Sequence, residues 1–194
     1  SSGGQLLELA SENNKPYVKV PTGLQPRAAF GIMTKAVMHF VSLDIGSEYL
    51  KLCNQAGDYL NEALGNQTEN ELLSHALKIS KEISTKTSVI YGGTPLTYLV
   101  AQRWKTQINE NAKSKAFVGY MPEIHHNEIL SWEANKQDSK NNYHLLFLRS
   151  PNENSQISKR FELTKKIIGD KVEISEIENI SSDNIISNLF HLTL

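Results

Sequence analysis

Apolar residues recur at helical spacing along much of the chain. In the clearest case, residues 29–40, they fall at i, i+3, i+4, i+7, i+8 and i+11, which places them on one face of a helix. Further amphipathic patterns predict helices at residues 5–11, 47–63, 69–83, 95–108, 124–132, 157–168 and 182–194. The polar tract at residues 65–69 separates two of them, and a second polar tract at residues 136–142 is interpreted as an exposed loop.

Short apolar runs between these helices predict strands at residues 17–21, 88–91, 115–120, 143–149 and 172–177. Strands that alternate with helices favour a parallel sheet with helices on both faces, so we predict an α/β fold. Ligands of such sheets bind beyond the carboxyl ends of the strands. Polar segments follow three of the predicted strands there, at residues 21–27, 91–94 and 120–127.

Composition and charge narrow the possible partners and compartment. The formal net charge of −1 over 194 residues gives no basic surface for nucleic acid or a membrane. A single cysteine, Cys53, excludes an internal disulfide and fits a reducing compartment, and its helical context favours a buried, inert thiol. Neither a membrane-spanning run nor a signal peptide is recognisable, so we expect a cytoplasmic protein. The start at Ser1, without Met, is interpreted as the middle of a longer chain.

One candidate for chemistry is the polar run Asn109-Glu110-Asn111, which lies beside an apolar helical stripe. Asn favours caps and turns over helix interiors, so the run marks a helix end. By spacing alone, a frayed end with solvated side chains is favoured over a functional site.

A second candidate is the segment from Met121 to Glu128, which contains two histidines and two carboxylates. A zinc site is disfavoured because His125 and His126 are adjacent, point apart on a helix and lack an HExxH pattern. Two interpretations stay open. The segment is either a plain helix start with Pro122 in its first turn, or part of an acid/base pair with a distant carboxylate.

Two weaker candidates follow predicted strands. Arg27 stands at the positive end of a helix dipole, where it is either an exposed surface residue or a cation aimed at an anionic substrate or oxyanion. The Gly92-Gly93-Thr94 turn could bind an anion through backbone amides. It matches no phosphate-binding motif, so a plain strand-to-helix turn is favoured.

Together these segments resemble the bifunctional phosphoglucose/phosphomannose isomerase family. The order and approximate spacing of four stretches match: Ser2-Gly3-Gly4; Val20-Pro21-Thr22-Gly23-Leu24-Gln25-Pro26-Arg27-Ala28-Ala29; Arg103-Trp104-Lys105 through Asn109-Glu110-Asn111-Ala112-Lys113; and Pro122-Glu123 through His126-Asn127-Glu128-Ile129.

The resemblance implies a fold and a domain order. Members of that family contain two sugar isomerase (SIS) domains, each a flavodoxin-like α/β sandwich with a parallel sheet. This chain resembles the second of them. Residues 1–40 would form a linker segment with the first helices, and residues 41–194 the C-terminal SIS domain.

The resemblance also implies an activity. Such enzymes interconvert glucose 6-phosphate and mannose 6-phosphate with fructose 6-phosphate through a cis-enediol. Glu110 would move the proton between C1 and C2, His126 would assist ring opening, and Arg27 would stabilise the enediolate. His126 would come from the neighbouring subunit of a homodimer. No metal or organic cofactor is implied. The alternatives are a non-catalytic sugar-phosphate-binding SIS module and a dimerisation domain.

Two departures from the family pattern bear on activity. The chain lacks the first SIS domain, whose Ser/Thr-rich loop grips the sugar phosphate in that family. It also stops before the family's final helix, which carries a Thr and a Lys near the site and is tied to the choice between glucose and mannose phosphates. We therefore expect this chain on its own to be inactive or very weak.

Overall fold

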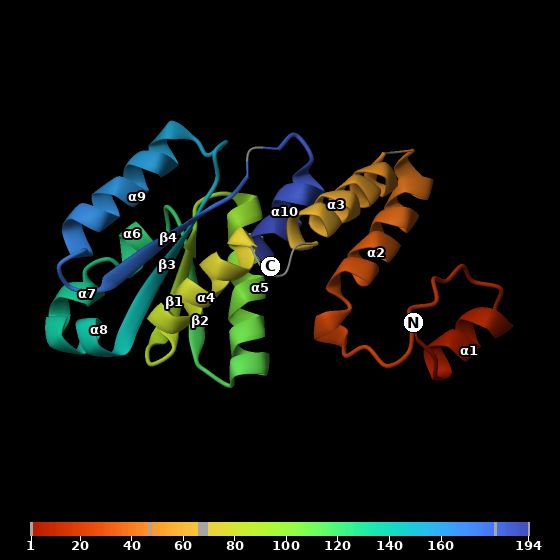
Figure 1. Cartoon of the computed structure of the whole chain (residues 1–194), viewed down its shortest axis with the longest axis horizontal. Helices are drawn as coiled ribbons and strands as arrows, with labels where there is room; N and C mark the ends of the chain where they lie inside the picture. The colour runs from red at the N-terminus through yellow and green to blue at the C-terminus, as the bar shows by residue number, and fades with distance from the viewer. Residues whose placement is uncertain (1, 47, 66–69, 181, 194) are drawn as a thin grey trace. The chain divides into compact units, whose positions relative to one another are not determined.

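A computed structural model describes residues 2–46, 48–65, 70–180 and 182–193 (Figure 1). The chain divides into two compact units, Ser1–Gly57 and Asp58–Leu194, and the division falls within α3 (Tyr49–Leu64). The predicted domain boundary after residue 40 lies inside α2 (Phe30–Ile45). As a boundary between functional domains it stays a prediction.

The first unit is helical in its described part. It contains α1 (Gln5–Glu12), a 3-10 turn (Pro26–Ala28), α2 and the start of α3. Both helices predicted at residues 5–11 and 29–40 are confirmed. The strand predicted at residues 17–21 is wrong, because this segment is outside any helix or strand. An alternating pattern identifies a segment that could form a strand, but a strand is stable only when it pairs with a neighbour. The sheet found in the described residues lies wholly in the second unit.

The second unit is built on a four-stranded parallel sheet in the order β2-β1-β3-β4. Its strands are β1 (Thr87–Gly92), β2 (Ala116–Tyr120), β3 (Tyr143–Arg149) and β4 (Glu173–Glu178). The helices of this unit after α3 are α4 (Glu71–Ile83), α5 (Pro95–Gln107), α6 (Ile124–Asn127), α7 (Ser131–Ala134), α8 (Lys136–Asn142), α9 (Ser155–Ile168) and α10 (Ile185–Thr193). The predicted α/β fold with a parallel sheet is confirmed.

Helices cover both faces of this sheet (Figure 1). Successive side chains of a strand point to opposite faces, so each central strand feeds two cores. Val89 and Tyr91 join Phe161 of α9 in one core, whereas Ile90 joins Val100 of α5 in the other. The first core also contains Ile124 and Trp132 of α6 and α7, and the second contains Ile79 and Leu192 of α4 and α10.

The loop predicted at residues 136–142 is wrong, since these residues form α8. The side chain of Asn135 caps the helix by accepting a hydrogen bond from the Asp138 amide at 3.2 Å. Side chains one turn apart then pair along it, Gln137 with Asn141 at 3.0 Å and Asn142 with Asp138 at 2.6 Å. The polar composition of this segment was therefore compatible with a helix, which its own side chains and the buried Ser139 support.

Several other predictions are refined. Residues 124–132 form two short helices, α6 and α7, in place of one helical segment. Cys53 is buried in α3, as predicted, and burial raises the pKa of its thiol despite the opposing effect of Lys35. The predicted element ends at residues 47, 69 and 194 and the tract 66–69 lie outside the described residues. None of the described helices is long and apolar enough to cross a membrane.

Candidate active site

Glu110 lies in a π-helical turn (Ile108–Ala112) that continues α5. The amide of Ser114 reaches back to the carbonyl of Ile108 at 3.4 Å, and the turn ends at Lys113 with a positive φ of 55°. A non-glycine residue in that left-handed region is uncommon and needs support from its surroundings. The chain therefore leaves α5 through a wider, π-helical turn that ends in a left-handed residue.

The side chains of this turn are hydrogen-bonded. Asn109 donates to the carbonyl of Ser114 at 2.8 Å, Asn111 donates to Gln107 at 2.7 Å, and Lys113 donates to the carbonyl of Glu110 at 2.6 Å. A frayed helix end would lack these bonds, so the run is not frayed, although the side chains of Glu110 and Asn111 are solvent-exposed as that interpretation expected. Glu110 is solvent-exposed on this ordered turn. Short π-helical insertions are frequent at functional sites.

The two histidines of α6 have different surroundings. His125 points toward α9, where its ring is within 2.7 Å of the Thr164 hydroxyl and 2.9 Å of the Arg160 guanidinium. Burial lowers the pKa of His125, and the charge of Arg160 lowers it further. His126 is exposed. Of the pair, His126 is the side chain that a ligand can reach.

Glu110 and His126 lie at opposite ends of β2. The π-helical turn precedes the strand at the amino edge of the sheet, and α6 follows it at the carboxyl edge (Figure 1). At about 3.3 Å per residue, a five-residue strand spans about 16 Å. The fold thus separates these two side chains within one copy of the chain.

Arg27 belongs to the first unit and the other two predicted site residues to the second. It is half-buried in the 3-10 turn that precedes α2, after Pro26 at the first position of the turn. The segment of residues 21–27 does not follow a strand, so the expectation that it lies at the edge of a sheet is not met.

The Gly92-Gly93-Thr94 segment is a plain strand-to-helix turn. The amides of Gly93 and Thr94 both donate to the hydroxyl of Thr97, at 3.0 Å and 2.9 Å, and Thr94 caps α5. These amides are already satisfied by a side chain of the helix, so the anion-binding interpretation has no support here.

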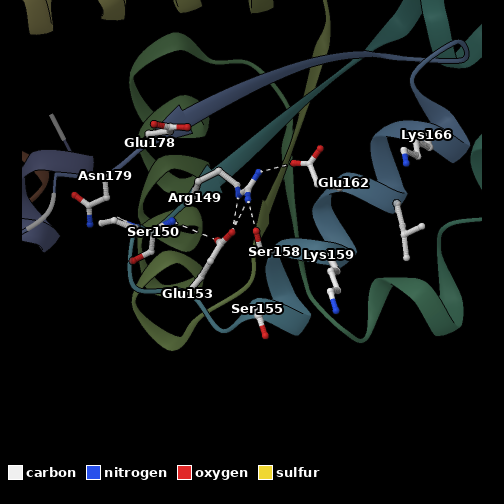
Figure 2. A pocket seen from close by; sticks show the side chains of 12 residues that line it. Arg149, Ser150, Glu153, Ser155, Ser158, Lys159, Glu162, Lys166, Glu178 and Asn179 are labelled. Carbon is white, nitrogen blue, oxygen red and sulfur yellow. Dashed lines mark hydrogen bonds and ion pairs between the residues drawn. The ribbon is translucent and has the colours of Figure 1, made fainter.

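A cavity of about 790 Å³ opens at the carboxyl ends of β3 and β4, beside α9 (Figure 2). Arg149 forms its centre and donates to Glu153 at 2.5 Å and to Glu176 at 2.6 Å, with its guanidinium 4.6 Å from the ring centre of Phe161. Burial opposes the charge of Arg149, but the two carboxylates raise its pKa. Because this cation is already compensated, it ties β3, β4 and the start of α9 together.

This cavity is lined by none of the three predicted site residues. The sequence analysis did not predict this cavity. Arg149 at the end of an apolar strand, followed by polar residues, could have indicated a polar site there. Its lining residues are Arg149, Ser150, Pro151, Glu153, Ser155, Ser158, Lys159, Glu162, Leu163, Lys166, Glu178 and Asn179. Within the described ranges, no group of three or more His, Cys, Asp or Glu side chains gathers as metal ligands.

Residues 73–194 match the sequence profile of the bacterial phospho-glucose isomerase C-terminal SIS domain. The chain belongs to this family. The match covers the sheet, the π-helical turn and α6, so the SIS domain contains both Glu110 and His126. Membership in this family confirms the predicted fold class and the resemblance drawn from the four sequence stretches.

Among curated relatives, the chain is 35% identical over 172 residues to a bifunctional phosphoglucose/phosphomannose isomerase of Aquifex aeolicus, over 88% of this chain and 49% of the relative. It is 32% identical to a D-glucosamine-6-phosphate 4-epimerase of Sulfolobus acidocaldarius, over 66% of this chain and 39% of the relative. The chain spans about half the length of the isomerases that it matches.

Solved structures agree on the fold. A glucose-6-phosphate isomerase like protein from Thermus thermophilus superposes with a TM-score of 0.60 at 15% identity, over 92% of this chain and 59% of that one. At this identity the likeness concerns the SIS architecture alone.

Proposed function

We propose that this chain is the C-terminal half of a two-SIS-domain aldose–ketose isomerase that interconverts glucose 6-phosphate and mannose 6-phosphate with fructose 6-phosphate. The observation that carries the proposal is the hydrogen-bonded π-helical turn that presents the carboxylate of Glu110. The reaction is proposed from the similarity of the chain to phosphoglucose/phosphomannose isomerases. A second domain is expected because those relatives are about twice as long as the matched region.

The reaction needs three groups, and the proposed residues fit them. A base takes the proton from C2 of the open-chain aldose and returns it to C1, which is the role of Glu110. An acid/base group protonates the ring oxygen as the C1 hydroxyl loses its proton and the ring opens, which is the role of His126. A cation stabilises the enediolate oxygens between the two transfers, which is the role of Arg27. As the C2 proton passes to C1, the hydroxyl proton of O2 is lost and O1 gains one through the enediol, so the proton balance closes without a cofactor.

The placement of Glu110 and His126 at opposite ends of β2 supports a homodimer. A single copy separates the two side chains by the length of a strand, whereas a second copy can bring its carboxyl edge to the amino edge of the first. In this arrangement, Glu110 of one subunit faces His126 of the partner subunit across an isologous interface.

The proposed function also assigns a role to each part of the chain. Residues 1–40 act as the linker between the two SIS domains and deliver Arg27, and residues 41–194 form the C-terminal SIS domain. The substrate is a sugar phosphate whose phosphate group is gripped by the first domain. The enzyme works in the cytoplasm, in carbohydrate metabolism around glycolysis and gluconeogenesis.

The test is a Glu110→Gln substitution in the full-length protein, assayed in both directions with glucose, mannose and fructose 6-phosphates. Removing the general base is expected to lower kcat by about 10²- to 10⁴-fold. Glu12→Gln, at an exposed carboxylate in α1 outside the proposed site, is the matched control and retains wild-type turnover. Isomerisation by the Glu110→Gln protein at the wild-type rate would remove Glu110 from catalysis.

A second candidate is epimerisation of an amino-sugar phosphate at C4, favoured by the similarity to the Sulfolobus acidocaldarius enzyme. The same assay separates the candidates when product identity is read by NMR. Fructose 6-phosphate indicates the isomerase, and a C4 epimer of glucosamine 6-phosphate indicates the epimerase. Binding of both sugars without turnover indicates a non-catalytic SIS module.

A further inference from the structure

Helix α6 carries His126 but is too short to be stable by itself. It has four residues, Ile124–Asn127, whereas isolated helices shorter than about 12–15 residues are marginal in water. The side chain of His126 forms no hydrogen bond with the described part of the chain. Its direction must therefore come from the residues that flank it.

The first flanking contact is made by His125. An Arg guanidinium only donates, so Nδ1 of His125 accepts from Arg160 and the ring proton lies on Nε2. The Thr164 hydroxyl donates its own hydrogen to the carbonyl of Arg160 at 2.7 Å, so it accepts from Nε2 at 2.7 Å. Every hydrogen of this cluster is assigned in one way only. His125 is a neutral histidine that fastens α6 to α9.

The second flanking contact is a buried chain of hydrogen bonds through Tyr91. The hydroxyl of Tyr91 donates to Glu128 at 3.0 Å, and the indole of Trp132 donates to that hydroxyl at 3.2 Å. Tyr91 is fully buried in β1, and burial together with the charge of Glu128 raises its pKa, so it keeps its proton. Glu128, two residues after His126, is thereby fastened to the sheet.

Between these contacts, α6 packs closely on β2. Ile124 is buried over Gly119, where an added Cβ would come within 2.6 Å of the Ile124 side chain and of the Tyr91 ring. The absent side chain lets the helix approach the strand. His126 is thus the exposed member of a turn fixed at residues 124, 125 and 128.

We propose that His125 and Thr164 on one side, and Glu128 and Tyr91 on the other, are positioning residues for His126. They touch no substrate, and they act by fixing the backbone turn from which the His126 imidazole projects. The proposal rests on the proposed function of His126. Misplacing a catalytic group by about 1 Å can cost up to about 10²-fold in rate, so the expected effect is large.

The first test is Thr164→Val in the full-length protein. Valine keeps the shape but removes the acceptor for His125. We expect kcat to fall about tenfold or more, with KM for fructose 6-phosphate within about twofold of the wild-type value. The Cε1 NMR signal of His126, assigned by its loss in His126→Gln, is expected to shift or broaden. Thr164→Ser keeps the hydroxyl and is expected to show the wild-type kcat and the wild-type His126 signal.

A second variant probes the other contact. Tyr91→Phe removes the donor to Glu128 and is expected to lower kcat and perturb the same His126 signal. Ile177→Val, a truncation in the opposite core, controls for lost stability and leaves both readouts unchanged. Assays run well below the thermal midpoint of each variant. A variant that loses only thermal stability, with kcat and the signal unchanged, would overturn the positioning role.

The two readouts keep this proposal separate from the proposed function. If His126→Gln isomerises at the wild-type rate, the catalytic role of His126 fails, whatever the other variants do. If His126→Gln is inactive but Thr164→Val and Tyr91→Phe leave both the kcat and the His126 signal unchanged, only the positioning role fails.

Discussion

Among single residues, Gly92 shows how closely the sheet and its helices approach. A Cβ added there would lie 2.6 Å from the backbone nitrogen of Tyr98 and 2.7 Å from the carbonyl carbon of Thr97. These are backbone atoms of α5, so they cannot turn aside as a flexible side chain would. Gly92 is therefore needed because β1 packs closely against α5, and not because the turn binds an anion.

Gly92→Ala is therefore expected to destabilise the SIS domain by about 1–3 kcal/mol, the usual cost of overpacking. Gly57→Ala is the matched control. Apart from the adjoining residues and the backbone of α3 itself, no described atom lies within 4 Å of a Cβ at this position, and Ala is favoured over Gly in a helix by about 1 kcal/mol. Thermal unfolding of the full-length protein should show a lower midpoint for the first variant and an equal or higher one for the second.

The neighbouring histidines are the clearest contrast between side chains. Sequence spacing treats His125 and His126 alike, and only the resemblance to the isomerase family distinguished them. The structure gives each a different environment because Arg160 and Thr164, from α9, contact one ring and leave the other exposed. In the proposed site His125 therefore holds the turn from inside, whereas His126 projects from the same turn into solvent.

Among helices and strands, α8 shows how a side-chain cap supports a short polar helix. All seven of its residues are polar, so no apolar stripe holds it to a core, although Ser139 is buried. Asn135 supplies the acceptor for the first turn. Capping contributes a large share of the stability of so short a helix.

Asn135→Ala is expected to cost about 0.5–2 kcal/mol and to expose residues 136–142 to proteolysis. Asn135→Asp keeps an oxygen acceptor at the cap and is expected to cost little. Amide hydrogen exchange across this segment provides the measurement. Unchanged protection in the alanine variant would mean that contacts other than the cap hold α8.

The end of α5 is an ordered turn where the sequence pattern predicts a loss of order. Periodicity predicts the helix to residue 108, and the polar run after it reads as a loss of order. The chain instead widens into an ordered π-helical turn, in which Asn109 and Lys113 donate hydrogen bonds to the backbone carbonyls of Ser114 and Glu110. The ordered turn gives Glu110 a fixed exit from the helix.

At the scale of the whole molecule, β2 separates Glu110 from His126, so dimers that combine two different variants should differ in activity from either homodimer. In the proposed dimer, each site takes Glu110 from one subunit and His126 from the other. A heterodimer of Glu110→Gln with His126→Gln then contains one site with both substitutions and one site with neither.

Two inactive full-length homodimers, Glu110→Gln and His126→Gln, are therefore expected to complement each other after subunit exchange. Random mixing in equal amounts makes about half of the dimers mixed, each with one intact site, and so restores about a quarter of wild-type activity. Mixing either variant with itself is the control. No recovery, despite subunit exchange confirmed by mass spectrometry, would show that both residues act within one subunit.

The sequence by itself determined the α/β class, most helices and the four strands of the sheet. It could do so because helix and strand periods depend on residues only a few positions apart. The short motifs around Glu110 and His126 also pointed to the isomerase family, which the family comparison confirmed. Their roles as site residues stay predictions.

Only the tertiary structure decided the rest. It showed that residues 17–21 are not a strand, that His125 is fastened to α9, that Gly92 packs on a helix backbone, and that Glu110 and His126 lie at opposite edges of the sheet. Each of these depends on contacts between residues distant in sequence or on the direction of a strand. Such contacts follow from how elements pack, and local patterns do not contain that information.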